Sequence, residues 1–460
     1  MKNALCLSVL IIVPLLAAAD KTPVSFSRDI APILRANCQG CHKPEKKKGG
    51  LDLSTYAALL KGGKHGITVK ARDTKSLLLE QVRGKEPEMP PEGDPLKPAE
   101  VALLERWVME GATDDTGITA NVANAPVAAA AEYHAAPAVT ALAWSPDGSA
   151  LAVAGYREVL LHKPDGSGVI ARLPCEATRI ESLTYSRDGK ILAACGGYPG
   201  LFGQVLLWDA ATQKPLAAHK LTSDSLFGLS LSPDGTRVAV GCADRTARII
   251  AASDGKELMK FDQHTDWVFA TVFNNDGKRV ITGSRDRAIK MINAETGELI
   301  DDLNKSTECV LALTRHPTEE IVVFGGDKGL IRSYKMADAK RDEKNDDPYR
   351  LKEYERLPGA VQTLVFSPDG KFIAAGGQSK EVRISKFEGG RAATLTGFTA
   401  PVFALAFSPD SKQIAVSGMD GIVRLFDTST GKPVKEFVSI PGVKTAAAQP
   451  AAGNSEKAAK

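Results

Sequence analysis

The sequence predicts a multidomain protein in which a small all-α domain precedes an all-β domain built as a seven-bladed propeller. Residues 20–115 contain apolar residues at helical spacing. Beyond residue 133 a turn motif recurs at intervals of 41 to 51 residues, which is the length of a four-stranded propeller blade. The 41 glycines and 26 prolines, with only 6% aromatic residues, favour many short strands joined by turns.

Charge and hydropathy exclude some classes of function. The 58 basic and 55 acidic residues nearly balance, and without a long basic stripe they give no support for nucleic-acid binding. Residues 1–19 carry Lys2, an apolar run and three small residues before Asp20, which predicts a cleaved signal peptide. The alternative is an uncleaved anchor. The signal peptide predicts a periplasmic or otherwise exported protein. No later stretch is apolar enough to span a bilayer, so we expect no integral span in the mature chain.

Four further segments follow the leader. We expect a helical domain at 20–115, a linker at 116–132, the propeller at 133–440 and a disordered tail at 441–460. Within the helical domain, four helices are expected from capping and breaking residues. The first begins near Phe26, with Ser27 or Asp29 as N-cap, and the other three span 54–61, 74–83 and 98–111.

The organising motif of the helical domain is Cys38-Gln39-Gly40-Cys41-His42. Two cysteines three residues apart followed at once by a histidine indicate covalent attachment of c-type haem. The cysteine sulfurs bind the haem covalently, and the histidine is the proximal ligand of its iron. A zinc site is the alternative, but it would need a second pair of ligands, and none lies nearby in the sequence.

The distal iron ligand is less constrained by the sequence. Met89 lies in the stretch Glu86 to Pro91, where three prolines stiffen the chain. It follows His42 by 47 residues, with two expected helices between them, so it can approach from the opposite side. We predict Met89 as the distal ligand, with His65 and Met109 as rivals.

The domain resembles the planctomycete-type cytochrome c family over residues 20 to 115. The most specific matching parts are Cys38 to His42 and Met89-Pro90-Pro91. Further matches are Phe26 to Leu34, Gly49 to Leu53, Lys61 to Gly63, Ser76 to Leu78 and Leu104 to Ala112. The resemblance implies one haem c per chain, with thioethers to Cys38 and Cys41 and axial ligands His42 and Met89.

The repeated turn defines the second domain. It occurs as Trp144 to Gly148, Tyr185 to Gly189, Leu231 to Gly235, Phe273 to Gly277, Phe366 to Gly370 and Phe407 to Ser411, with a degenerate copy at Arg315 to Thr318. Apolar runs flank each turn, as strands of a blade require. In period and turns the region resembles WD40 repeats, which implies a propeller that binds proteins.

Several positions refine this resemblance. Trp208-Asp209 is the only literal Trp-Asp pair, and His264 and Asp286 occupy the family's structural positions, whereas Ile292 replaces its tryptophan. His162 and His316 are expected in turns or at the surface. The outer strand of the last blade is expected either at 433–438 or from the chain before residue 139.

These patterns predict an exported c-type cytochrome that transfers single electrons, with the propeller as a platform for a partner protein. Its redox partner proteins and the ligand of the propeller are not named by the sequence. The alternative is a propeller oxidoreductase whose electrons pass to the cytochrome domain, although no recurring His, Asp or Arg cluster supports it. In a third interpretation haem only stabilises the small domain. We therefore expect an electron carrier and binding protein rather than an enzyme.

Overall fold

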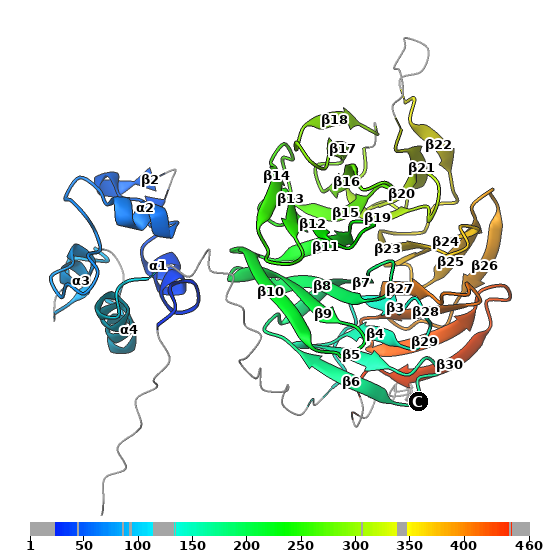
Figure 1. Cartoon of the computed structure of the whole chain (residues 1–460), viewed down its shortest axis with the longest axis horizontal. Coiled ribbons are helices and arrows are strands. Elements are labelled where there is room, and N and C mark those ends of the chain that lie inside the picture. The colour runs from blue at the N-terminus through cyan, green and yellow to red at the C-terminus, as the bar shows by residue number, and fades with distance from the viewer. Residues whose placement is uncertain are drawn as a thin grey trace, which may run out of the picture. The chain divides into compact units, whose positions relative to one another are not determined.

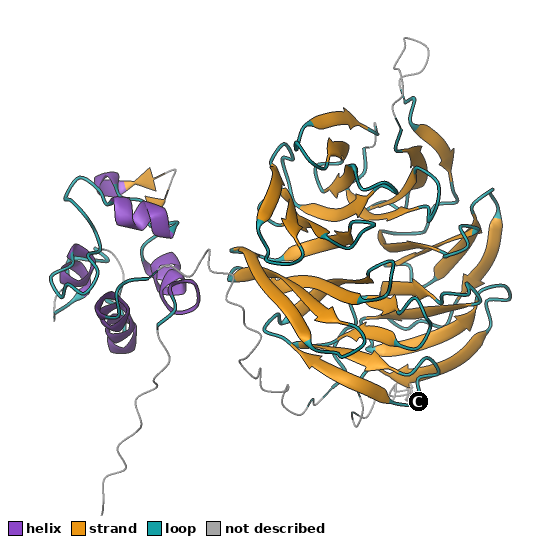
Figure 2. Cartoon of the chain, viewed as in Figure 1, coloured by secondary structure: helices purple, strands orange, loops and turns teal. Residues whose placement is uncertain are grey.

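The structure is a computed structural model that describes residues 24–43, 46–84, 87–91, 94–113, 133, 135–304, 307–337, 347–440 and 443. The predicted leader and linker lie outside these residues, and so does the predicted tail apart from residue 443. The chain divides into two compact units, Met1–Ile118 and Thr119–Lys460. The first is mainly helical and the second is built of strands (Figures 1 and 2).

The first unit contains several short helices (Figure 1). In chain order they are the π-helix η1 (Phe26–Ile30), α1 (Ala31–Asn37), the 3-10 helix η2 (Lys48–Gly50), α2 (Tyr56–Lys61), α3 (Leu77–Val82) and α4 (Pro98–Met109). The strands β1 (His42–Lys43) and β2 (Lys46–Lys47) form a two-residue antiparallel pair. Among the described residues, no helix is long and apolar enough to cross a membrane.

The beginning of the first helix differs from expectation. The chain makes a π-turn before the α-helix, and neither Ser27 nor Asp29 is its N-cap. Instead the Asp29 carboxylate accepts a hydrogen bond from the Ser25 backbone N–H at 2.9 Å. Thr55 caps α2 as a side-chain acceptor for the Ala58 N–H, which fits the preference for threonine there.

An aromatic cluster holds the helices of the first unit together. Trp107 of α4 is fully buried, and its ring centroid lies 5.4 Å from that of Phe26. Phe26 also contacts Tyr56 edge-to-face at 5.1 Å. The Tyr56 hydroxyl donates to the Ala112 carbonyl, and the Trp107 indole N–H donates to the Thr113 carbonyl. The cluster therefore buries no unpaired donor.

The second unit is a propeller of seven four-stranded antiparallel blades. Blade 1 consists of β3 (Leu142–Trp144), β4 (Leu151–Ala154), β5 (Glu158–His162) and β6 (Val169–Pro174). Blade 2 consists of β7 (Arg179–Tyr185), β8 (Ile191–Tyr198), β9 (Phe202–Asp209) and β10 (Pro215–Thr222). Blade 3 consists of β11 (Leu226–Leu231), β12 (Arg237–Cys242), β13 (Ala247–Ala251) and β14 (Glu257–Phe261). Blades 4 and 5 consist of β15 (Val268–Phe273), β16 (Arg279–Ser284), β17 (Ile289–Asn293) and β18 (Leu299–Asp302); and β19 (Val310–Arg315), β20 (Ile321–Gly326), β21 (Ile331–Lys335) and β22 (Arg350–Glu353). Blades 6 and 7 consist of β23 (Val361–Phe366), β24 (Phe372–Gly377), β25 (Val382–Lys386) and β26 (Arg391–Leu395); and β27 (Val402–Phe407), β28 (Gln413–Gly418), β29 (Ile422–Asp427) and β30 (Pro433–Val438).

The first strand of every blade faces a central channel. The channel has a volume of about 730 Å³, and every innermost strand contributes an apolar side chain to it. These side chains are Leu142, Leu183, Leu229, Val272, Leu313, Leu364 and Leu405. Strands arranged in this radial way bury their two faces against neighbouring blades, which explains their continuous apolar runs.

The repeated turn joins the first and second strands of a blade. In blade 1 the Ser145 hydroxyl donates to the Asp147 carboxylate at 2.6 Å, and the same carboxylate accepts the Ser149 N–H. Gly148 follows at φ +73°, a left-handed conformation that glycine adopts without strain. The turn therefore recurs because its hydrogen bonds and its glycine are local, which makes it visible in the sequence.

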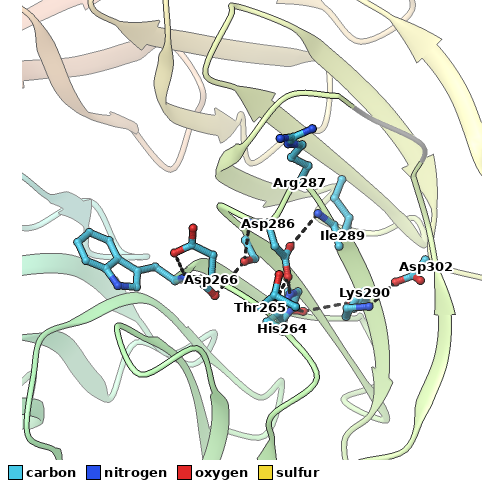
Figure 3. Close-up of polar contacts among 12 residues, drawn as sticks. His264, Thr265, Asp266, Asp286, Arg287, Ile289, Lys290 and Asp302 are labelled. Carbon is cyan, nitrogen blue, oxygen red and sulfur yellow. Dashed lines mark hydrogen bonds and ion pairs between the residues drawn. The ribbon is translucent and has the colours of Figure 1, made fainter.

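Blade 4 carries the polar network expected from His264 and Asp286 (Figure 3). The imidazole bonds through Nδ1 to Asp286 at 2.8 Å and through Nε2 to the Thr282 hydroxyl at 2.7 Å. Asp286 also accepts the N–H groups of Thr265 and Ala288. The network thus joins the loop between blades 3 and 4 to the second strand of blade 4, although Ile292 stands where a tryptophan would complete it.

The closure of the ring is settled by strand order. β30 is the outer strand of blade 7, so the described residues before Val139 supply no strand to that blade. The first and last blades instead meet through the Val139 N–H, which donates to the Gly418 carbonyl at 2.9 Å. His162 Nε2 donates to the Ser439 carbonyl at 2.9 Å, and its ring packs at an interplanar angle of 40° against Phe437.

The surface alternative predicted for His162 and His316 was wrong. Both side chains are buried, at 2% and 6% exposure. His162 occupies the seam between blades 1 and 7, and His316 packs against Phe366 and Phe387 of blade 6 at about 5 Å. Neighbouring blades cover these turn positions, and a pattern within one repeat cannot show that contact.

Candidate functional site

The Cys-x-x-Cys-His segment lies immediately after α1. The N–H groups of Cys41 and His42 both donate to the Cys38 carbonyl, at 3.1 and 3.0 Å. This tight turn brings both sulfur atoms and the imidazole to one cavity with a volume of about 570 Å³. A volume of this order suits a bound cofactor.

His42 is oriented by the backbone that follows it. Its Nδ1 lies 3.1 Å from the carbonyl oxygen of Lys48. Because a carbonyl can only accept, Nδ1 carries the hydrogen and Nε2 keeps its lone pair. A backbone carbonyl that holds Nδ1–H in this way is the usual support of a metal-binding histidine, so Nε2 is the atom available to iron.

Cys38 has the properties of a thiol rather than of a thiolate. Burial raises the pKa of Cys38 to about 11, so its sulfur is protonated at neutral pH. A zinc site would need further ligands. No group of three or more potential metal-binding side chains occurs in the part of the chain that the structure describes. The donor set therefore fits thioether attachment better than zinc.

Met89 lines the same cavity from the loop after α3. Its N–H donates to the Gln81 carbonyl at 2.9 Å, and the Gln81 side chain donates to Glu88 at 2.8 Å. The methionine side chain is half-buried and packs against the apolar core. The loop is thus held to the end of α3, with the thioether at the cavity that His42 also lines.

The two rivals of Met89 differ in position. His65 also lines the cavity, but its side chain is exposed. It lies in a turn closed by reciprocal backbone hydrogen bonds between Gly63 and Gly66. Met109 is 45% exposed at the end of α4 and is not among the lining residues. The structure therefore brings Met89 and His65 to the site and leaves Met109 outside it.

The remaining lining suits a flat apolar cofactor. The apolar side chains in it are Leu51, Leu53, Leu77, Leu78, Val82 and Leu96. Thr68 adds a buried hydroxyl with no hydrogen-bond partner in the described structure, so a polar edge of a bound group could satisfy it. Gly63 keeps the wall close, because a Cβ there would lie 2.8 Å from the Gly49 carbonyl oxygen. These features, with the free Nε2 of His42, fit a haem.

Sequence reasoning missed the residues that support this site. Thr68 lies outside any helical pattern, and Gln81 and Lys48 act through backbone carbonyls, which leave no mark in a sequence. Four apolar residues at the start of the domain are buried in its core and do not line the cavity: Phe26, Ile30, Ile33 and Leu34.

Comparison with known families agrees with both units. Residues 38–93 match the family model described as planctomycete cytochrome C. Five segments match WD domain, G-beta repeats: residues 131–161, 212–250, 255–293, 351–384 and 389–427. Strands β7 to β9 of blade 2 and β19 to β21 of blade 5 fall outside these matches, although the structure shows both blades.

A search among curated proteins gave no match. The family matches nevertheless coincide with the two structural units: the cytochrome match lies in the helical unit, and the repeat matches lie in the propeller. Together they support a chain in which a planctomycete-type cytochrome c domain is fused to a seven-bladed WD40 propeller.

Proposed function

We propose that the protein is an exported c-type cytochrome that carries single electrons and binds a partner protein through its propeller. One observation supports this above all. A single cavity of about 570 Å³ is lined by Cys38, Cys41 and His42 and also by Met89. In this proposal the cysteines hold one haem c covalently, His42 is the proximal ligand, and Met89 is the distal ligand.

The ligand set argues for electron transfer rather than for catalysis at iron. With His42 and Met89 as axial ligands, no coordination position remains for a substrate. A thioether ligand also raises the reduction potential, which suits an electron carrier. The domain would therefore change oxidation state without making or breaking bonds.

Export and partner binding complete the proposal. Residues 1–19 have the pattern of a signal peptide, and c-type haem is joined to proteins outside the cytoplasm. The two features favour the same compartment, the periplasm or another exported location. The propeller supports a role in protein binding, because such repeats present broad faces of loops.

Haem attachment and ligation can be tested on the full chain, produced in a host with haem-attachment machinery. We expect haem to stay with the denatured protein and the ferric spectrum to show low-spin iron with the long-wavelength sulfur-to-iron band. Met89→Ala should abolish that band, bind carbon monoxide readily and lower the reduction potential. A high-spin five-coordinate ferric spectrum in the unmodified protein would contradict the electron-carrier proposal.

Two matched variants identify the ligand. His65→Ala removes the other candidate that lines the cavity, and Met109→Ala removes a methionine that does not line it. Both should keep the sulfur band if Met89 is the ligand. Loss of the band in Met109→Ala would overturn the assignment, and persistence of the band in Met89→Ala would do the same.

A further inference from the structure

Two arginines from opposite parts of the propeller meet at one end of its central channel. Arg187 follows β7 of blade 2, and Arg315 is the last residue of β19 in blade 5. Leu183 and Leu313, on the same two strands, line the channel. The guanidinium groups therefore lie just beyond the channel, at the ends of its innermost strands.

The two side chains share the same two acceptors. Arg187 Nη2 lies 3.4 Å from the Asn275 side-chain oxygen and 3.5 Å from the Pro317 carbonyl oxygen. Arg315 Nη1 donates to the same Asn275 oxygen and lies 3.5 Å from the same carbonyl. Two positive charges are thus held beside each other around one neutral amide.

No carboxylate pairs with either arginine among the described residues. Other arginines of the propeller do pair with a carboxylate: Arg248 lies 2.7 Å from Asp244, and Arg424 lies 2.7 Å from Asp420. The nearest candidate here, Glu320, already accepts from the Asn274 side chain and the Asn275 N–H, each at 3.0 Å. Burial, and then the charge of Arg187, lower the pKa of Arg315, while Glu320 opposes that effect.

Most donors of the pair have no partner among the described protein groups, and Arg187 is exposed to solvent. A guanidinium has five N–H donors in a planar fork, and only one nitrogen of each arginine has a partner in the described structure. Like charges at this separation repel, and an anion between them would both neutralise them and occupy the free donors. Carboxylate and phosphate oxygens match this fork geometry.

We propose that Arg187 and Arg315 form an oxyanion-binding site at this end of the channel. Asn275 is the positioning residue, because its amide oxygen holds both guanidinium groups. Its own position is fixed by Glu320 and by the Glu319 carbonyl, which accepts the Asn275 side-chain N–H at 2.8 Å. The site takes a carboxylate or phosphate group, either free or carried by a larger molecule, and it does not depend on electron transfer.

The test uses the full haem-loaded chain and three anions at equal ionic strength: inorganic phosphate, acetate and chloride. Thermal unfolding of the propeller, followed by the circular dichroism of its strands, reports binding without involving the haem. An anion that binds the folded state at about twenty times its Kd should raise the Tm by roughly 2–4 °C over chloride. A rise with phosphate alone identifies phosphate, and a rise with acetate identifies carboxylate.

Arg187→Gln separates anion binding from a structural role. It should weaken oxyanion binding at least tenfold, and in chloride its Tm should equal or exceed that of the unmodified protein, because the like-charge contact is removed. Lys190→Gln is the matched control, since it removes a charge from the same turn at a side chain that is 79% exposed. The control should keep the oxyanion shift.

Three outcomes would overturn the proposal. They are no Tm rise with either oxyanion over chloride, an unchanged rise in Arg187→Gln, and equal loss of the rise in Lys190→Gln. An isothermal titration with phosphate and acetate checks the same Kd values directly. If the Tm of Arg187→Gln falls in chloride, binding in Arg315→Gln decides, and an unweakened Kd there would refute the site.

Discussion

Removal of the Asp286 carboxylate tests how much the polar network of blade 4 stabilises the propeller. The carboxylate accepts hydrogen bonds from the His264 ring at 2.8 Å and from the N–H groups of Thr265 and Ala288, each at 2.9 Å. In Asp286→Ala these three donors lose their acceptor, among them His264 and Thr265, which lie beside Asp286 in Figure 3. His264 is only 4% exposed. We expect this variant to be clearly less stable.

The magnitude follows from the partners. Hydrogen bonds to a charged group contribute about 1.5–3 kcal/mol each, but bonds to one carboxylate are not additive, and water can reach the loop donors. We expect a loss of about 3 kcal/mol, which corresponds to a Tm decrease of roughly 6 °C. Burial alone would raise the pKa of Asp286, but hydrogen bonds from His264, Ala288 and Thr265 hold that pKa well below its ordinary value.

The sign of the pH dependence follows. A carboxyl whose pKa is lowered in the folded state stabilises the protein above its ordinary pKa of about 4, and this contribution is lost as the pH falls below that value. The Tm difference between the unmodified protein and Asp286→Ala should therefore be full at pH 7 and should shrink in acid.

The assay is thermal unfolding of both proteins, followed by circular dichroism, with Asp244→Ala as the matched control. Asp244 occupies the same turn position in blade 3, but its side chain is exposed and it bonds to Arg248 and the Thr246 N–H without a histidine. When Asp244 is removed, Arg248 keeps a second carboxylate, Glu257, at 2.9 Å, so we expect Asp244→Ala to lose less stability than Asp286→Ala. Equal Tm decreases in the two variants would refute the reasoning.

Two further variants test the seam and the turns. Burial lowers the pKa of His162, although its hydrogen bond to Ser439 opposes this shift. The folded protein therefore keeps the ring neutral and loses stability as the pH falls below about 6.5. In His162→Gln the Tm decrease between pH 7.5 and 5.5 should be smaller than in the unmodified protein. Arg245 has φ +70°, and Gly421 takes the equivalent turn position in blade 7 at φ +68°. Arg245→Gly should therefore raise the free energy of unfolding by about 0.5–1 kcal/mol, measured by urea titration, and a decrease would show that the arginine side chain stabilises the fold.

The blades were predictable because their information is local. Six of the seven turns combine a hydroxyl or amide with an aspartate two residues later, and five of them continue with a glycine, as in Ser145, Asp147 and Gly148. These contacts form within five residues. The haem motif was predictable for a similar reason, since one turn after α1 brings Cys38, Cys41 and His42 together. The structure confirms the number of blades and the two fold classes.

Features that join distant segments could not be predicted in this way. The burial of His162 depends on residues 277 positions later, and the meeting of Arg187 with Pro317 depends on how many blades separate them. The sequence predicts Met89 as the distal ligand but keeps His65 as a rival, because both residues follow the motif in segments outside the expected helices. In the structure Met89 is half-buried and packs against the core, whereas His65 is exposed.

The strand order at the seam has a consequence for the modular construction of the ring. Because every sheet consists of four consecutive strands, no blade borrows a strand from its neighbour. A circular permutation that moved the chain ends to any loop between two blades would therefore leave all the sheets intact. It would replace one covalent connection by another and would turn the present seam into an ordinary loop. For the same reason, a duplicated blade could be inserted between two others without rethreading the ring, which is the simplest way for such a ring to grow from repeats.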